Sequence, residues 1–353
     1  MIPRRQFIGS LAALAAGGVS QVRASGGMNA EVRPLDWKYE IIEPLPRKGS
    51  SRRPVVTGVS LQPGGDLLAI AGDDHLISIY NTEKQNIPKA LDEHTDWIRA
   101  VTFSPDGKFL ATAGNDHRLC LWNTGQLNDP VFIIENPAAI IDLAFSPNGD
   151  QIATVGFESK LRVFDAASGK QLLRFECPSS DNHSVAFSPD GKTISVGGRS
   201  GNIRSWDLEG GRLVFDRKLH RQRVRSLDFM PDGRLLSVSD DQVIKVTDLK
   251  DSARSTNFER GFSKLFAAAV LGPNLIATGG SNNLIDVWNV EPKPTHLGSL
   301  GKHTGTVSCL EYQNSKLVSG SFDTFVIIWD VDRQKNGPLQ RQTQKNGWNR
   351  ILN

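Results

Sequence analysis

Seven short runs of strand-forming residues in this chain end in an aromatic residue followed by Asp or Asn, or in a close variant of that pair. The second residues of these pairs stand 42, 42, 42, 41, 41 and 41 positions apart. The pairs are Tyr80-Asn81, Trp122-Asn123, Phe164-Asp165, Trp206-Asp207, Thr247-Asp248, Trp288-Asn289 and Trp329-Asp330. A fixed period of this length indicates one supersecondary unit stacked against copies of itself. The sequence therefore predicts a repeat protein of seven units.

A turn signal runs in phase with these endings. Prolines recur at intervals of 42 residues, at Pro63, Pro105, Pro147, Pro189 and Pro231, and Gly follows two places later. Pro presets the first corner of a turn and Gly accepts a positive φ, so each signal predicts a hairpin between two strands. Each period then contains four strands rich in Val, Ile, Leu and Thr. In the second repeat we expect strands a to d at 98–103, 108–114, 119–123 and 131–135.

With these phased motifs, residues 37–331 resemble the WD-repeat β-propeller family. The resemblance implies an all-β fold, a seven-bladed β-propeller of four-stranded antiparallel blades. The last repeat has no fourth strand of its own after Asp330, whereas residues 37–42 read as a strand before the first repeat. We expect this N-terminal strand to close the ring as the outer strand of blade seven, because an open ring would expose a sheet edge.

The resemblance also implies buried polar tetrads. The matching residues are His94, Thr112, Asp116 and Trp122 in repeat two, His303, Ser319, Asp323 and Trp329 in repeat seven, and His220, Ser237 and Asp241 in repeat five. A His, a Ser and an Asp together are also what a hydrolase triad needs. These sets repeat with the blades, and catalysis needs one set only, so we interpret them as structural networks and expect no catalytic residue.

The N-terminus resembles a twin-arginine export signal. Arg4 and Arg5 precede a short stretch rich in Ala and Gly, and Ala24 ends a possible cleavage site. We therefore divide the chain into a signal peptide (1–24), a linker (25–36), the propeller (37–331) and a polar, basic tail (332–353). The expected location is periplasmic or secreted. The alternative is a cytoplasmic protein that starts at Met28.

Charge and cysteine content restrict the partners. Loss of Arg4, Arg5 and Arg23 would leave 38 of the 41 basic residues against 38 acidic ones. A chain with no net charge gives little support to a nucleic-acid or membrane partner. Three cysteines are an odd number, and their spacing fits neither a zinc site nor a disulfide framework. We expect no metal and no cofactor.

A binding surface is expected on one face of the ring. In an antiparallel meander the d–a loops and the b–c turns emerge on the same side, and Arg and aromatic residues are frequent interface anchors. The candidates on this rim are Arg52, Trp97, Arg99, Phe157, Arg199, Arg221, Arg223, Arg225, Phe262, Lys264 and Phe322. We expect the cluster Arg221, Arg223 and Arg225 to bind an acidic partner or a ligand, unless nearby Asp residues neutralise it or solvent surrounds it.

These features favour a non-enzymatic, monomeric platform that binds a protein or peptide. The first alternative is a propeller enzyme or small-molecule binder with its site at the central channel. That site would need converging carboxylates or histidines outside the tetrads, and the histidines available near this face are His75, His117 and His183. The second alternative is the cytoplasmic scaffold from Met28. The sequence names no partner, because repeats define the scaffold and loops define specificity.

Overall fold

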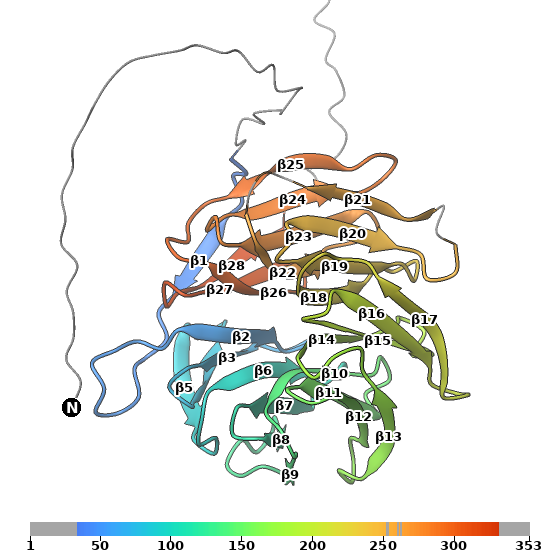
Figure 1. The fold of residues 1–353 in the computed structure, drawn as a ribbon. Helices are drawn as coiled ribbons and strands as arrows, with labels where there is room; N and C mark the ends of the chain where they lie inside the picture. The colour runs from blue at the N-terminus through green and yellow to red at the C-terminus, as the bar shows by residue number, and fades with distance from the viewer. Residues whose placement is uncertain (1–33, 252–253, 260, 262, 332–353) are drawn as a thin grey trace, which may run out of the picture. The chain divides into compact units, whose positions relative to one another are not determined.

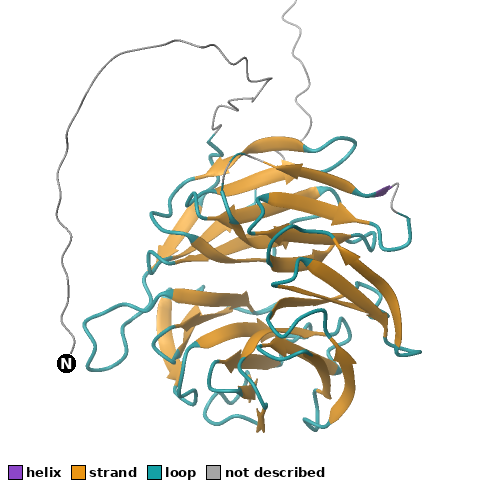
Figure 2. Ribbon diagram, viewed as in Figure 1, coloured by secondary structure: helices purple, strands orange, loops and turns teal. Residues whose placement is uncertain are grey.

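The computed structural model describes residues 34–331, except 252–253, 260 and 262. Within these residues the strands form seven four-stranded sheets, and neighbouring strands in each sheet are antiparallel. Figure 1 shows the sheets as successive blades, and Figure 2 shows that short loops join the strands. The prediction of a seven-bladed propeller is confirmed. The described part of the chain has no helix long and apolar enough to cross a membrane.

The strands a, b, c and d occupy equivalent places in every blade. The a strands are β2 (Val56–Leu61), β6 (Ile98–Phe103), β10 (Ile140–Phe145), β14 (Asn182–Phe187), β18 (Val224–Phe229), β22 (Leu265–Val270) and β26 (Val307–Gln313). The b strands are β3 (Leu67–Gly72), β7 (Phe109–Gly114), β11 (Gln151–Gly156), β15 (Thr193–Gly198), β19 (Leu235–Ser239), β23 (Leu275–Gly280) and β27 (Lys316–Ser321). The c strands are β4 (Ile77–Asn81), β8 (Arg118–Asn123), β12 (Lys160–Asp165), β16 (Asn202–Asp207), β20 (Val243–Thr247), β24 (Ile285–Asn289) and β28 (Val326–Asp330). The d strands are β5 (Asn86–Leu91), β9 (Phe132–Glu135), β13 (Gln171–Glu176), β17 (Arg212–Lys218), β21 (Thr256–Glu259), β25 (Thr295–Leu300) and, for blade seven, β1 (Tyr39–Ile42).

The Pro-containing turns fix where strands a and b end. In blade two, the Ser104 hydroxyl donates to the Asp106 carboxylate at 2.6 Å and accepts the backbone amide of Phe109 at 2.9 Å. Gly107 then takes a φ of +70°, a conformation that a residue without a Cβ adopts readily. The same Ser-to-Asn or Ser-to-Asp bond recurs at Ser146 and Ser188. The turn is therefore held by its own side chains.

The cores lie between adjacent blades. One cluster joins Ile79 of blade one to Leu110 and Trp122 of blade two, and all three are almost fully buried. Each b strand has nearly all its residues buried because blades pack against both of its faces. This is why the b strands consist mainly of apolar and small residues with no alternation of buried and exposed positions.

The ring closes as the sequence predicts. β1 pairs with β28 in a register that runs from Tyr39 opposite Trp329 to Ile42 opposite Val326. Just before β1, the Leu35 amide donates to the Ser299 carbonyl of β25 at 2.9 Å, within the stretch expected to be a linker. The signal residues Arg4, Arg5 and Ala24, the rim residue Phe262 and the tail 332–353 lie outside the described residues.

Candidate binding surface at the mouth of the central cavity

The tetrad of repeat two forms a buried chain of hydrogen bonds. The Trp122 indole donates to the Thr112 hydroxyl at 3.0 Å, which lies 2.8 Å from His94 Nε2. His94 Nδ1 lies 2.8 Å from a carboxylate oxygen of Asp116. Because an ionised carboxylate only accepts, this order of partners places the His94 proton on Nδ1. Every polar side-chain atom of this tetrad therefore has a partner.

The tetrad of repeat seven repeats these contacts, and that of repeat five repeats them in part. Trp329 donates to Ser319 at 2.9 Å, and His303 lies 2.8 Å from Ser319 and 3.0 Å from Asp323. In repeat five, His220 lies 2.8 Å from Ser237 and 3.1 Å from Asp241. Thr247 stands where the others have an indole, so Ser237 receives no bond of that kind.

The tetrads connect two loops rather than face solvent. His94, His220 and His303 are 2%, 1% and 7% exposed. Burial raises the pKa of Asp116, but hydrogen bonds from His94 and from the amides of Thr95 and Arg118 outweigh it and hold that pKa below its ordinary value. An ionised Asp thus fastens the d–a loop to the b–c turn. Such sets are unsuited to substrate chemistry because a substrate does not reach them.

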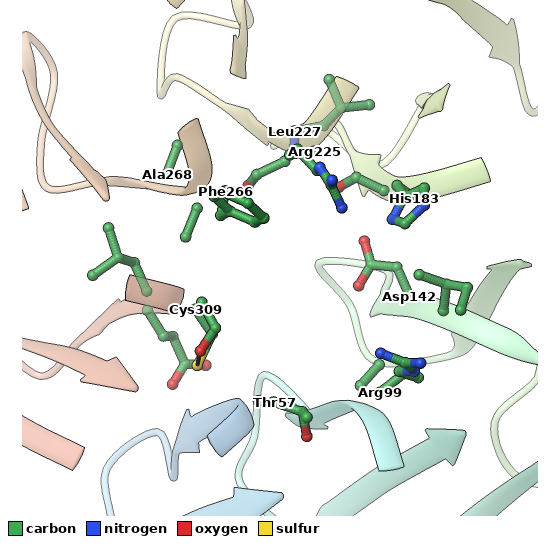
Figure 3. A pocket seen from close by; sticks show the side chains of 18 of the residues that line it. Thr57, Arg99, Asp142, His183, Arg225, Leu227, Phe266, Ala268 and Cys309 are labelled. Carbon is green, nitrogen blue, oxygen red and sulfur yellow. Dashed lines mark hydrogen bonds between the residues drawn. The ribbon is translucent and has the colours of Figure 1, made fainter. Parts of the chain in front are cut away.

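The a strands surround a cavity of about 760 Å³. In each a strand, the pairing with strand b shifts at the second residue, which is left outside the ladder as a β-bulge. These seven residues all line the cavity, and we call them the bulge ring: Thr57, Arg99, Ile141, His183, Arg225, Phe266 and Ser308. Five of them are labelled around the opening in Figure 3. Because a bulge changes the direction of a side chain, each blade contributes one bulged residue to the cavity lining.

Five of the eleven predicted rim residues also line this cavity: Arg99, Phe157, Arg223, Arg225 and Phe322. Phe157 and Phe322 follow strands β11 and β27, and each is 49% exposed. The other described rim residues do not line it, although they are exposed: Arg52, Trp97, Arg199, Arg221 and Lys264. The sequence thus predicts which residues lie on this face, and the structure shows which of them line the cavity. Their part in partner binding stays a prediction.

The arginine cluster divides in two. Arg223 pairs with Asp181 at 2.9 Å, and Arg225 pairs with both oxygens of Asp240 at 2.8 and 3.1 Å. The Arg225 guanidinium also lies 4.7 Å from the centre of the Phe266 ring. Asp181 and Asp240 therefore neutralise Arg223 and Arg225, which is the alternative that the sequence left open for this cluster. Arg221 is exposed.

Arg99 differs from the other arginines at the cavity. Its guanidinium lies 5.0 Å from the ring centre of Trp97, and its Nε donates to the Asn115 amide oxygen at 2.9 Å. Burial lowers the pKa of Arg99, and the charge of Asp96 opposes that effect. Within the described residues Arg99 has no carboxylate within ion-pair distance. It therefore offers terminal N–H groups to an anion from outside.

Sequence reasoning did not find the carboxylates of the a strands. Asp142 accepts the Val185 amide of the next blade at 2.9 Å, and Asp228 accepts the Val270 amide at 3.0 Å. Burial raises the pKa of both to about 6, while these amide bonds lower it. Glu311 accepts the Ser60 hydroxyl, and burial raises its pKa to about 7. Each of these carboxylates bonds to an adjacent blade and so joins two blades. Fewer carboxylates are therefore left without a hydrogen-bond partner for an enzyme site at the central channel.

Two other kinds of chemistry have no support among the described residues. There is no group of three or more His, Cys, Asp or Glu side chains there that could hold a metal ion. Burial raises the pKa of Cys120, Cys177 and Cys309 to about 12, so their thiols remain protonated at neutral pH.

His183 lies 2.9 Å from Asp181, and burial lowers the pKa of His183 to about 4, together with the nearby charges of Arg223 and Arg225. His183 is therefore neutral at pH 7.

Three curated proteins share short segments with the chain. Mitochondrial division protein 1 of Schizosaccharomyces pombe is 35% identical over 68 residues, 18% of this chain and 10% of that protein. The p21-activated protein kinase-interacting protein 1-like protein of Xenopus laevis is 34% identical over 70 residues, 19% of each chain. Its namesake from Danio rerio is 39% identical over 59 residues, 16% of each chain. The similarity thus spans a fifth or less of these relatives.

One family model covers far more of the chain. The model described as the IFT122 first β-propeller matches residues 55–314, from the start of blade one into blade seven. This match, together with seven four-stranded blades and the phased aromatic-Asp/Asn endings, agrees with the resemblance to WD-repeat propellers. The chain belongs to the IFT122 first β-propeller family.

Proposed function

We propose that residues 37–331 form a non-enzymatic platform that binds a protein or peptide at the cavity mouth. We define the cavity mouth as the bulge ring together with Trp97, Phe157 and Phe322. The observation that carries the proposal is that Arg99, which has no carboxylate partner among the described residues, lines one cavity with the exposed Phe157 and Phe322, and that the exposed Trp97 ring lies beside Arg99. Aromatic residues and Arg dominate binding energy at protein interfaces. The name of the frog and fish relatives, a kinase-interacting protein, agrees with a role in protein interaction.

The cavity mouth suits an acidic, partly apolar segment. Arg99 keeps its terminal N–H groups for a carboxylate, because Asn115 occupies only its Nε. Phe157 and Phe322 supply exposed apolar surface in the lining of the cavity, and the Phe157 ring meets His183 edge-on at 6.4 Å between centroids. The rigid blades hold these groups in place before binding, which reduces the entropy lost on association.

Site-specific cross-linking tests this proposal. A photo-reactive phenylalanine analogue replaces Phe157 in the full chain, and the cross-linked products are identified by mass spectrometry. The control carries the same analogue at Leu213 on the outer strand β17, which is 51% exposed against 49% for Phe157. We expect a defined product from position 157 only, and Arg99→Glu should reduce it severalfold. Equal products from both positions would reject the cavity mouth as the binding surface.

We also propose that residues 1–24 direct export, on the strength of Arg4, Arg5 and the small residues that end at Ala24. The relatives named above are eukaryotic and lend this proposal no support. Intact-mass measurement of the native protein in envelope and cytoplasmic fractions tests it. A chain that begins at Ser25 in the envelope is expected, whereas a cytoplasmic chain that begins at Met28 would contradict export.

A further inference from the structure

The aromatic residue at the end of strand c fills the space between two blades. Trp206 stacks on Phe175 of the preceding blade, with 5.3 Å between ring centres. Trp288 contacts Phe258 of its preceding blade with 5.1 Å between ring centres, although these two rings are tilted by 56°. An aromatic ring stands at this point of strand c in six of the seven repeats. Repeat five is the exception, because it has Thr247 there.

The strand register shows that the partner ring is missing too. Phe175 stands opposite Leu161 in blade three, and Phe258 stands opposite Ile244 in blade five. The equivalent pair in blade four is Ile203 with Arg217. Between blades four and five, therefore, Arg217 and Thr247 stand where the two flanking interfaces, between blades three and four and between blades five and six, each have a pair of rings.

A cavity of about 200 Å³ occupies that place, and we call it the blade 4–5 slot. Phe215 and Leu219 of blade four contribute apolar lining, and Leu249 contributes from blade five. Phe215 and Thr247 are only 8% and 6% exposed, so the slot reaches into buried structure. An apolar cavity of about 150 Å³ is known to accept a benzene molecule. The slot therefore has room for one aromatic ring.

The lining is also positively charged. Arg217, Lys245 and Lys250 line the slot, and none of them forms an ion pair within the described residues. The only acidic side chain in the lining is Asp248, which pairs with Arg254 at 3.0 Å and accepts the Lys250 amide at 2.9 Å. Arg217 lies 5.7 Å from the centre of the Phe215 ring, at the boundary between the apolar and charged lining. A ligand with a negative charge beside its ring would match both parts.

We propose that the blade 4–5 slot binds a planar aromatic ring that carries a carboxylate. The ring takes the place left by the missing stack, against Phe215 and Leu249, and the carboxylate faces Arg217, Lys245 and Lys250. The chain's own Trp348 is disfavoured as occupant, because the segment 332–353 has five basic residues and one acidic residue. This site is separate from the cavity mouth and does not depend on the function proposed for it.

Three ligands with the same ring and different charge test the proposal by calorimetry and methyl NMR on the full chain. They are indole-3-propionate, indole and tryptamine, which are anionic, neutral and cationic. We expect indole-3-propionate to bind with a Kd of about 1 mM or tighter. Indole should bind more weakly by roughly two- to fivefold per lost charge contact, and tryptamine weakest. Absence of binding, or tryptamine binding as tightly as indole-3-propionate, would overturn the proposal.

Two variants locate the site. Thr247→Trp restores the repeat pattern and fills the slot, so it should abolish binding while the thermal midpoint stays equal or rises. Arg217→Glu changes an exposed charge and should remove the preference for the anion without removing the ring from the slot. Binding that persists in Thr247→Trp, or an anion preference unchanged in Arg217→Glu, would show that the ligand lies elsewhere. If Thr247→Trp does not fold, the anion preference measured in Arg217→Glu tests by itself whether the ligand lies in the slot.

Discussion

Glu311 in β26 accepts a hydrogen bond from the Ser60 hydroxyl in β2, with 2.8 Å between the two oxygens. The same carboxylate accepts the backbone amide of Leu61. β26 belongs to the last blade and β2 to the first, so one side chain joins the ends of the ring beside the cavity. The pairing of β1 with β28 completes the same blade at its outer edge.

Glu311 should make stability depend on pH near neutrality. Burial raises its pKa from 4.5 to about 7, so the folded state favours the protonated form. The stability that this shift contributes is complete below pH 4.5 and is lost as pH rises through 7. His183 acts in the opposite sense, because its lowered pKa of about 4 makes stability rise with pH through its ordinary value of 6.5. Asp142 and Asp228, with pKa values raised to about 6, act in the same sense as Glu311 at slightly lower pH. The difference between the native protein and a variant without the Glu311 carboxylate therefore isolates its contribution between pH 6.5 and 8.

We expect the free energy of unfolding to fall by about 1 kcal/mol between pH 6.5 and 8 because of Glu311. Glu311→Gln, which has no titrating group, should lose most of that decline. Urea titrations at both pH values measure it, with Glu93→Gln as a control at a carboxylate whose side chain is about one-third exposed. An equal decline in native protein and Glu311→Gln would show that other groups cause it.

The tetrads predict unequal costs for the same kind of deletion. Thr112→Ala removes the partner of both the Trp122 indole and the His94 ring, whereas Ser237→Ala removes the partner of His220 alone. Each buried polar atom left without a partner costs about 1–3 kcal/mol. Thr112→Ala should therefore destabilise the fold by roughly twice as much as Ser237→Ala, as measured by chemical denaturation. Thr112→Ser keeps the hydroxyl and serves as the control; equal losses at the two sites would argue against the indole bond.

Removal of β1 should weaken the entire ring. A chain that starts at residue 34 keeps the pairing with β28 and the buried side chains of Trp37 and Ile42, each 4% exposed. A chain that starts at residue 44 loses all of them and exposes the edge of β28. We expect the free energy of unfolding of the second chain to be lower by several kcal/mol, given about 2–3 kcal/mol for each large apolar side chain removed from the core, and its thermal midpoint to be lower accordingly. Thermal scans with equal midpoints for the two chains would contradict the closure.

The cysteines should resist thiol reagents in the native state. Burial raises the pKa of all three thiols to about 12, so at pH 7 very little thiolate is present. Mass spectrometry after iodoacetamide treatment should show no added groups on the native protein within minutes and three after denaturation. Rapid native labelling at Cys309, the one that lines the central cavity, would show that its surroundings are more open than described.

The fold was predictable because its local signals are repeated. Pro105 with Gly107 marks a turn, Trp122 marks the end of strand c, and their recurrence at one interval leaves few other architectures. The closing strand was predictable because residues 37–42 have a strand pattern in the sequence and the last repeat shows no fourth such pattern. The segment at Pro34 and Leu35 was less predictable, since its pairing with Ser299 gives no periodic pattern in such a short stretch.

The candidate site was predictable only in part. Arg99 and Phe157 could be placed on the correct face from strand order, but their approach to one cavity depends on bulges that have no side-chain signature. The pairing of Arg223 with Asp181 joins residues 42 positions apart, and a single sequence contains no sign of it. The repeat period does place the members of the bulge ring at equivalent positions, 41 or 42 residues apart, but it does not show that these positions are bulges.

The pairing of β1 with β28 joins two strands that are synthesised at very different times. β1 is among the first parts of the propeller to leave the ribosome, and its partner strand is synthesised nearly 300 residues later, as residues 39–42 and 326–330 show. Until then the first strand has no neighbour to complete its ladder, although six blades already have all their strands. Contacts between such distant segments form slowly. The nascent chain must therefore keep an unpaired strand exposed throughout synthesis, and chaperones that recognise extended apolar segments have that interval in which to act.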